Sequence, residues 1–372
     1  MTLPDSHSVV NRRTFIAAGA SLATAALFAR PAISRAAAPP RTLQGKVGQL
    51  FVISFAGTTA SASLLAQLQK YHFGGVCLFA RNCVSPAQIT HLLRQIQGAS
   101  SYPLLICTDQ EGGEVVRIRN GAPAFPSEAY YGQIGSAARV FADATTTARD
   151  LHTLGLTLNL APVVDVLSNP QSPIGTRSYG PNPQLDAQLS AAAVRGYQQH
   201  RLGATAKHFI GLGHTSVNSH QALPVVNRTL AQLEANDLIP FRAAIASGVS
   251  TLLVAHVSLP AIDPVHRPAS LSPVIIGGVI RKHLGFNRVV MTDSLAMGAI
   301  SVGTAEAAQD ALAAGADLLL IASDKNIPDG AFDAAYQRVL WAVKTGRIPE
   351  SRLDSAVNRI LALKRAYPPA IL

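Results

Sequence analysis

Charged and histidine side chains stand at the ends of several apolar runs, where a hydrophobic core would otherwise exclude them. An aspartate can attack an electrophilic carbon, a lysine can donate charge-assisted hydrogen bonds, and a histidine can exchange a proton near neutral pH. The polar residues at such positions are Arg81, Asn82, Asp109, Asp165, Lys207, His208, His256 and Asp293. Together they predict a catalytic site that is assembled from the ends of strands.

Eight apolar runs, separated by longer amphipathic segments, carry these polar residues. The runs are 48–55, 75–80, 104–109, 156–165, 204–209, 251–257, 288–293 and 317–322. Such alternation is typical of repeated βα units and a parallel sheet. Eight strands close a barrel, and the strand ends of a barrel meet at one rim. The sequence therefore predicts an α/β protein with a TIM (β/α)₈ barrel, and a doubly wound sheet is the main alternative.

The segments between the runs are the candidate helices. They are 86–97, 136–154, 184–201, 229–247 and 302–314, and a final helix over 351–366 is expected to pack outside the barrel. No internal linker, repeat or low-complexity tract marks a second domain. Residues 39–372 are therefore expected to form a single domain.

The first 38 residues have the composition of an export signal. Arg12 and Arg13 precede an apolar stretch over 14–29, and small residues follow at 36–38. This order is typical of a cleaved signal peptide, and NRRTFIA resembles a twin-arginine signal. An uncleaved anchor is the weaker alternative, because a membrane span needs roughly 20 apolar residues. We therefore expect a periplasmic or extracellular protein with no membrane span after cleavage.

The composition is that of an ordinary enzyme with a basic surface. The formal net charge is +10 at pH 7, and 48% of the residues are hydrophobic. The basic residues are scattered and accompany no nucleic-acid motif, so a solvated surface is the default and an anionic polymer is a further possibility. The three cysteines, Cys77, Cys83 and Cys107, lack the spacing of a zinc site or a disulfide framework. Buried free thiols are expected for Cys77 and Cys107.

Three motifs resemble glycoside hydrolase family 3, in its single-domain bacterial β-N-acetylglucosaminidase branch. TDQEGGEVVR (108–117), KHFIGLGHTSVNSH (207–220) and VVMTDSLAMGAI (289–300) occur in family order. Shorter matches such as GTRSYG and AHVSLPAIDP extend the similarity over nearly all of the chain after residue 38. The resemblance implies an exo-acting retaining glycoside hydrolase. Its expected substrates are terminal β-linked N-acetylglucosaminides of muropeptides or chitooligosaccharides.

The resemblance also implies roles for particular residues. Asp293 matches the family's nucleophile, and a retaining mechanism needs such a carboxylate close to the anomeric carbon. His220 matches the family's acid/base, a histidine on a loop after the fifth strand. The implied substrate-binding residues are Asp109, Arg117, Arg177, Lys207 and His208. For Arg117, a structural ion pair with Glu111 or Glu114 is the alternative.

The loop that carries His220 departs from the family pattern. Asn218 stands where the family has an aspartate that pairs with the histidine. An amide can orient an imidazole but cannot stabilise its charge as a carboxylate does. Ile210, Leu212 and His214 stand where proline, histidine and aspartate are usual. His214 is therefore either a replacement partner of His220 or a surface residue, and Asn218 and His214 are the candidates for modulating the acid/base.

These departures leave three activities open. The chain is a hydrolase of lowered activity, a phosphorolytic transferase in which phosphate meets less repulsion beside an amide, or a peptidoglycan-binding protein without turnover. Gly211 and Gly213 predict a loop that is free to close over the substrate. The six-residue spacing of His208, His214 and His220 does not match a zinc motif, so neither a metal nor another cofactor is expected. The sequence gives no indication of the oligomeric state.

Overall fold

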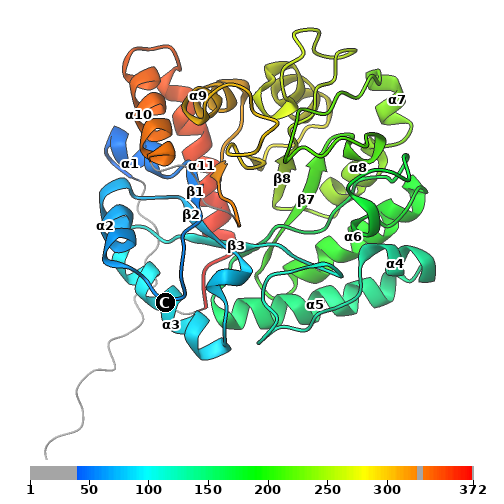
Figure 1. Ribbon diagram of the computed structural model, residues 1–372, viewed down its shortest axis with the longest axis horizontal. Helices are drawn as coiled ribbons and strands as arrows, with labels where there is room; N and C mark the ends of the chain where they lie inside the picture. Colours follow the sequence, from blue (N-terminus) through cyan, green and yellow to red (C-terminus); the bar gives the residue numbers. More distant parts are fainter. Residues whose placement is uncertain (1–39, 325–329, 371–372) are drawn as a thin grey trace, which may run out of the picture. The chain divides into compact units, whose positions relative to one another are not determined.

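A closed barrel of parallel strands forms the centre of the computed structural model, which describes residues 40–324 and 330–370 (Figure 1). The expected signal peptide, residues 1–38, lies outside the described residues. The strands are β1 (Phe51–Ile53), β2 (Gly75–Leu78), β3 (Leu105–Thr108), β6 (Leu158–Asn159), β7 (Gly203–Phe209), β8 (Thr251–Val254), β9 (Val289–Thr292) and β10 (Leu319–Ile321). They pair in the order β10-β1-β2-β3-β6-β7-β8-β9.

Strands β9 and β10 close the ring. The Thr292 N–H donates to the Leu318 carbonyl at 3.0 Å, and the Asp317 N–H donates to the Val290 carbonyl at 2.7 Å. Each strand matches one of the predicted apolar runs, with β7 beginning one residue earlier, because the strands of a parallel barrel are buried on both faces. The predicted barrel is confirmed, and the closed ring excludes the doubly wound sheet.

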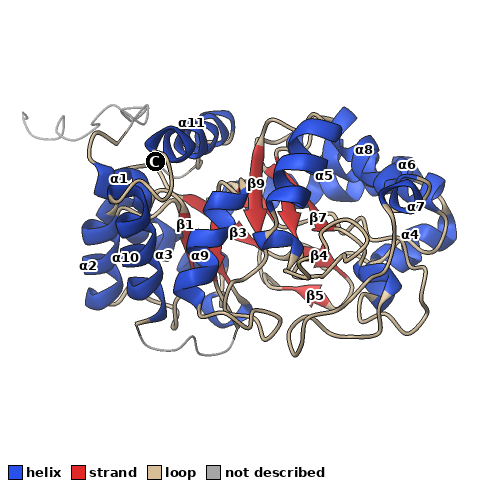
Figure 2. Ribbon diagram, turned by 90° about the horizontal axis from the view of Figure 1, so that it is seen from above, coloured by secondary structure: helices blue, strands red, loops and turns tan. Residues whose placement is uncertain are grey.

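Helices surround the strands (Figure 2). They are α1 (Leu43–Gly48), α2 (Ala62–Tyr71), α3 (Pro86–Ala99), α4 (Glu128–Ile134), α5 (Ala137–Leu154), α6 (Pro183–Gln198), α7 (Leu230–Glu234), α8 (Leu238–Ala246), α9 (Thr304–Ala314), α10 (Ala331–Lys344) and α11 (Glu350–Ala366). Single 3₁₀ turns are η1 (Ala80–Asn82), η2 (Gly175–Arg177), η3 (Leu212–His214) and η4 (Ala269–Leu271), and η5 (Val274–His283) is a π-helix. In the described part of the chain no helix is long and apolar enough to cross a bilayer.

The predicted helix over 229–247 is wrong as a single element. The chain forms α7 and α8 instead, and Asp237 lies at the break between them. Its carboxylate does not cap the first turn of α8 but accepts a hydrogen bond from His214 at 2.8 Å. A contact to a distant segment has therefore replaced a local one. The other predicted helices are present with ends that differ by a few residues, and α11 is the predicted final helix.

A short antiparallel ribbon follows β3 and was not predicted. It consists of β4 (Gln110–Gly112) and β5 (Val115–Val116). Gly112 and Gly113 turn the chain between them at φ values of +108° and +54°, which glycine adopts without the strain that a Cβ would cause. The ribbon carries Glu111, two residues after Asp109, and both carboxylates contact Lys207.

The opposite end of the barrel is held by a buried aspartate. Asp317, whose side chain is fully buried, pairs with Arg281 at 2.5 Å, Arg352 at 3.0 Å and Arg359 at 3.1 Å. Its Oδ2 also accepts the Val290 N–H at 3.0 Å. Since Arg352 and Arg359 belong to α11, this cluster ties the last helix to the closing strands.

Candidate active site

One cavity of about 530 Å³ opens at the carboxyl ends of the strands. Its volume is within the range of small-molecule sites. It brings together residues that the sequence motifs singled out: Asp109, Arg117, Arg177, Lys207, His208, Asn218, His220 and Asp293. His214 is the one predicted site residue that does not line it. Of the other strand-end residues, Arg81, Asn82, Asp165 and His256 lie outside the cavity wall.

Asp293 ends β9 with its carboxylate held against the backbone. Its N–H donates to the Val254 carbonyl at 2.9 Å, and its Oδ1 accepts the Ser294 N–H at 2.7 Å. Burial raises the pKa of Asp293. Electrostatic interactions with His256, His208 and His220 and the hydrogen bond from the Ser294 N–H outweigh burial and hold that pKa below its usual value. The side chain is therefore a half-buried carboxylate at neutral pH.

His256 supports Asp293 from behind the cavity wall. Its Nε2–H donates to the Ser294 carbonyl at 2.8 Å, and its Nδ1 accepts from the Ser270 hydroxyl at 2.7 Å. Burial lowers the pKa of His256, so the ring is neutral at neutral pH and serves as a hydrogen-bonding strut. It fixes the residue whose N–H binds the Asp293 carboxylate.

A network of ion pairs forms one wall of the cavity. Lys207 lies 2.6 Å from Asp109 and 2.5 Å from Glu111. Glu111 in turn accepts two hydrogen bonds from Arg177, at 2.7 and 2.9 Å. Burial lowers the pKa of Lys207, but Asp109 and Glu111 raise it above the usual value. Burial raises the pKa of Glu111, but Lys207 and Arg177 hold it far below the usual range. Lys207, Glu111 and Arg177 are therefore charged.

Glu111 is a functional residue that the sequence analysis missed. Its side chain is fully buried and joins Lys207 to Arg177. The signal that could have found it is the lysine at the end of an apolar run, because a buried cation requires nearby anions and Glu111 follows Asp109 by two residues. Arg177 is consequently held by Glu111 as well as lining the cavity.

Arg117 is not held by either glutamate that the alternative named. Glu111 is bonded to Lys207 and Arg177, while Glu114 accepts a hydrogen bond from the Thr176 hydroxyl at 3.0 Å. The Arg117 Nε lies 4.0 Å from Asp109 and has no hydrogen-bond partner among the described residues. Its guanidinium therefore keeps donors available for a ligand.

His208 is oriented by Asp165, which the sequence noted as a strand-end residue but gave no role. The Asp165 carboxylate accepts the His208 Nδ1–H at 2.7 Å and the His208 backbone N–H at 3.0 Å. This leaves Nε2 as the acceptor on the ring, and it lies 3.3 Å from an Arg177 nitrogen. The imidazole is thus locked in one orientation at the cavity wall.

The His220 loop is docked through its backbone onto the segment after Asp293. The Gly298 N–H donates to the His220 carbonyl at 3.3 Å, and the Ala299 N–H donates to the Ser219 carbonyl at 3.1 Å. The Asn218 side chain accepts the His220 backbone N–H at 2.9 Å. Asn218 therefore fixes the main chain of the loop, whereas the imidazole of His220 is exposed at the cavity mouth.

His214 is neither a partner of His220 nor a surface residue, so both predicted roles are wrong. Its Nε2 lies 2.8 Å from the Asp237 carboxylate, and the two side chains are only 9% and 4% exposed. The reason is the break between α7 and α8, which turns Asp237 towards the loop. His214 anchors the start of the loop to that break.

The loop glycines serve close packing in this structure. A Cβ at Gly213 would overlap the Val166 carbonyl oxygen, and Gly211 has a φ of +99°. Both positions therefore require glycine for the conformation seen. Freedom of the loop to close remains a prediction.

No metal-binding cluster of three or more histidine, cysteine or acidic side chains occurs in residues 40–324 and 330–370. His208 and His214 each have a separate carboxylate partner. The three cysteines are free, and Cys77 and Cys107 are buried as predicted. They are register partners on β2 and β3, and Cys77 contributes to the cavity floor.

Comparisons with known proteins agree on one family. The family model described as glycosyl hydrolase family 3 N terminal domain matches residues 42–363. A β-hexosaminidase of Nitrosomonas eutropha is 35% identical over 84% of this chain and 91% of its own length. A β-hexosaminidase of Stenotrophomonas maltophilia is 38% identical over 78% of this chain and 88% of its own length.

Solved structures give the same result. A glycoside hydrolase family 3 β-N-acetylglucosaminidase from a Paenibacillus species superposes with a TM-score of 0.85 at 41% identity, over 88% of this chain. The present chain spans 63% of that protein's length. A β-N-acetylhexosaminidase from Beutenbergia cavernae has a TM-score of 0.80 at 29% identity, and all of its length is covered.

The docking of the loop predicts the effect of Gly298→Ala. A Cβ at this position would lie 2.7 Å from the His220 carbonyl oxygen and 2.8 Å from that of Gln221. Overpacking of this kind costs about 1–3 kcal/mol, so the loop should separate from the segment after Asp293. Hydrogen exchange of the Ala299 amide should then accelerate about tenfold or more, since 1.4 kcal/mol corresponds to about a factor of ten.

The matched control is Gly98→Ala, because a Cβ there has no neighbour within 4 Å. It should leave the exchange of Ala299 unchanged. Unaltered exchange in Gly298→Ala would show that this glycine does not set the position of the loop.

Proposed function

We propose, starting from the fact that this chain belongs to glycosyl hydrolase family 3, that it is a retaining exo-hydrolase of terminal β-linked N-acetylglucosamine. The observation that carries the proposal is the shared cavity, in which Asp293 and His220 meet the sugar-binding candidates. The names of the relatives, β-hexosaminidase and β-N-acetylglucosaminidase, support the choice of sugar.

Asp293 acts as the nucleophile. Its pKa is held below the usual value, so the carboxylate is ionised at neutral pH. Attack on the anomeric carbon forms a glycosyl-enzyme bond to Asp293 while the bond to the leaving oxygen breaks. Water then attacks the same carbon from the side that the leaving group vacated, which releases Asp293 and retains the configuration.

His220 supplies and removes the proton. As imidazolium it protonates the leaving oxygen, and as imidazole it takes a proton from the attacking water in the second step. Imidazole is the side chain best suited to both roles, because it can act as general acid and as general base. The exposed position of His220 at the cavity mouth suits a group that must meet both the leaving sugar and water.

The ion-pair wall binds the sugar hydroxyls. Asp109 accepts hydroxyl hydrogen bonds, and Lys207 has one ammonium hydrogen left after its contacts with Asp109 and Glu111. Arg117 lines the same cavity, and its Nε approaches Asp109 no closer than 4.0 Å. His208 and Arg177 complete the wall, although Glu111 already occupies two of the Arg177 donors.

The first test is hydrolysis of an aryl β-N-acetylglucosaminide by the purified protein. Asp293→Ala should abolish it, because the variant lacks the carboxylate on which the glycosyl-enzyme bond is proposed to form. His220→Ala should lower kcat by about 10²–10⁴-fold, with the smaller loss for the better leaving group. His91→Ala, a change at an exposed histidine of α3, is the control and should have no effect.

Activity that survives Asp293→Ala would dismiss the assignment. Sugar-1-phosphate as the product in phosphate buffer would instead identify the phosphorolytic alternative. Rates measured on a muropeptide beside a chitobiose derivative decide between the two expected substrate classes.

The second test addresses Asn218. An aspartate at this position can still accept the His220 N–H that Asn218 accepts at 2.9 Å, so Asn218→Asp should keep the loop in place. It adds a negative charge beside the imidazole, which stabilises the imidazolium. Hydrolysis of unactivated sugars should therefore rise more than hydrolysis of substrates with good leaving groups. Equal effects on both classes would contradict a limit on the acid step.

We further propose that the protein is exported through the twin-arginine route and acts on cell-wall fragments. The support is Arg12-Arg13 followed by the apolar stretch 14–29. Replacing both arginines by lysine should leave an uncleaved chain in the cytoplasmic fraction, whereas Arg35→Lys should not. Fractionation and mass determination measure the outcome. Cleavage and export of the double variant would contradict this route.

A further inference from the structure

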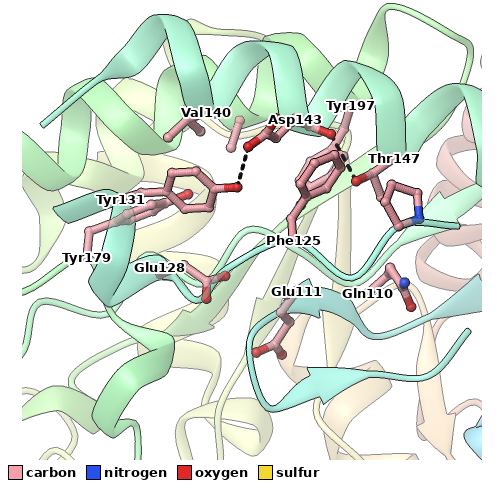
Figure 3. A pocket seen from close by; sticks show the side chains of 14 residues that line it. Gln110, Glu111, Phe125, Glu128, Tyr131, Val140, Asp143, Thr147, Tyr179 and Tyr197 are labelled. Carbon is pink, nitrogen blue, oxygen red and sulfur yellow. Dashed lines mark hydrogen bonds between the residues drawn. The ribbon is translucent and has the colours of Figure 1, made fainter. Parts of the chain in front are cut away.

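A small cavity of about 20 Å³ lies next to the ion-pair wall (Figure 3). Glu111, the buried link between Lys207 and Arg177, forms part of its lining. A second glutamate, Glu128, lines the same cavity, and aromatic residues from α4 and α6 cover it. Space of this size holds one water molecule, which needs about 10–15 Å³.

The chain brings the two glutamates together through close backbone packing. Glu111 lies on β4, and Glu128 is the first residue of α4. The Gly113 N–H donates to the Phe125 carbonyl at 2.9 Å, and a Cβ at Gly113 would lie 2.6 Å from the Ser127 Cβ. The ribbon therefore presses against the segment that leads into α4, and both carboxyl groups face one cavity.

Glu128 has no protein partner to compensate a negative charge. The residue is 3% exposed, and its Oε2 has no hydrogen-bond partner among the described residues. In Figure 3 no dashed line reaches its carboxyl group, whereas the Tyr131 hydroxyl is already bonded to Asp143 at 2.7 Å. A buried polar group without a partner is unfavourable by several kcal/mol in an apolar medium. The cavity has room for one water molecule, which would supply the missing partner.

Charge balance determines the ionisation state of Glu128. Lys207 and Arg177 already pair with Asp109 and Glu111, Arg117 lies 4.0 Å from Asp109, and no cation of the described residues forms an ion pair with Glu128. The other titratable groups around Glu128 are Tyr131, Asp143, Tyr179 and Tyr197, none of them a cation. Burial, and then the charge of Glu111, raise the pKa of Glu128 well above its usual value. Both effects favour the protonated form of Glu128.

We propose that Glu128 is a positioning residue of the sugar site, a neutral carboxylic acid that donates through one cavity water to the Glu111 carboxylate. Glu111 then holds Lys207 and Arg177 in the orientation that the sugar requires. The proposal rests on the proposed function, because it takes Lys207 and Arg177 as sugar-binding groups. Glu128 touches no substrate and acts only through Glu111.

The direction of the pH dependence follows from the raised pKa of Glu128. Its stabilising contribution is complete below the ordinary pKa of a glutamic acid and is lost as the pH rises through the raised value. Deprotonation places a second negative charge beside Glu111. That charge competes for Lys207 and Arg177, so sugar affinity should fall on the alkaline side.

Two variants separate hydrogen bonding from packing. Glu128→Gln keeps a neutral donor of the same shape, and Glu128→Leu removes the donor. The matched control is Asp186→Asn, a second fully buried acid whose Oδ1 accepts from the Ser190 hydroxyl at 2.6 Å and which lines neither cavity. Burial raises the pKa of Asp186 to about 8. It is therefore a protonated acid of the same kind with no link to Glu111.

Infrared spectroscopy at neutral pH tests the protonation state directly. The wild type should show absorption from protonated carboxyl groups, and Glu128→Gln should remove one component. Asp186→Asn should remove a different component. A spectrum that Glu128→Gln leaves unchanged would overturn the proposal, and this result does not depend on which ligand the protein binds.

Binding of N-acetylglucosamine by calorimetry tests the positioning role. Glu128→Gln and Asp186→Asn should bind within about twofold of the wild type, and Glu128→Leu about tenfold more weakly, as expected for the loss of a hydrogen bond to a charged group. The wild type should lose affinity at alkaline pH and Glu128→Gln should lose less. KM for the aryl glycoside should follow the same order.

Equal alkaline loss in Glu128→Gln and the wild type would overturn the proposal, even if Glu128→Leu fails to fold. So would wild-type affinity in a folded Glu128→Leu. A wild type that neither binds nor hydrolyses the sugar contradicts the proposed function instead, so the two failures are distinguishable.

Discussion

Neutralisation of buried charge at the mouth of the barrel is the constraint on which the site depends. Lys207, with a side chain 3% exposed, cannot lie there without nearby anions. Asp109 and Glu111 meet this requirement, and Glu111 forms a second ion pair with Arg177. The segments 109–111, 175–177 and 203–209 are therefore bound to one another by the same contacts that prepare the wall for a sugar.

This arrangement divides the site into a rigid wall and a peripheral loop. Most wall residues have a fixed partner, as the contacts of Lys207 with Glu111 at 2.5 Å and of His208 with Asp165 at 2.7 Å show. His220, by contrast, is exposed and is located by backbone hydrogen bonds. Recognition thus falls to preorganised groups, which need no rearrangement on binding. Proton transfer falls to a group in contact with water.

The sequence predicted the barrel well because burial on both faces makes each strand an apolar run. It predicted Asp293, His220 and the wall residues through local motifs, which can be identified in the sequence without knowing the fold. Contacts between distant segments escaped it. Glu111 and Arg177 are 66 residues apart, and His214 and Asp237 are 23 apart. The second pair also divides a helix that periodicity alone makes continuous, so no local pattern reveals it.

The backbone docking of the His220 loop has an evolutionary consequence. The bonds from Gly298 and Ala299 end on main-chain carbonyls, which every residue type possesses. Exposed side chains of the loop, such as Ser216 and Val217, can therefore be exchanged while the delivery point of the imidazole stays constant. The constraint lies instead on the facing segment at Gly298, where an added Cβ would lie 2.7 Å from the His220 carbonyl oxygen.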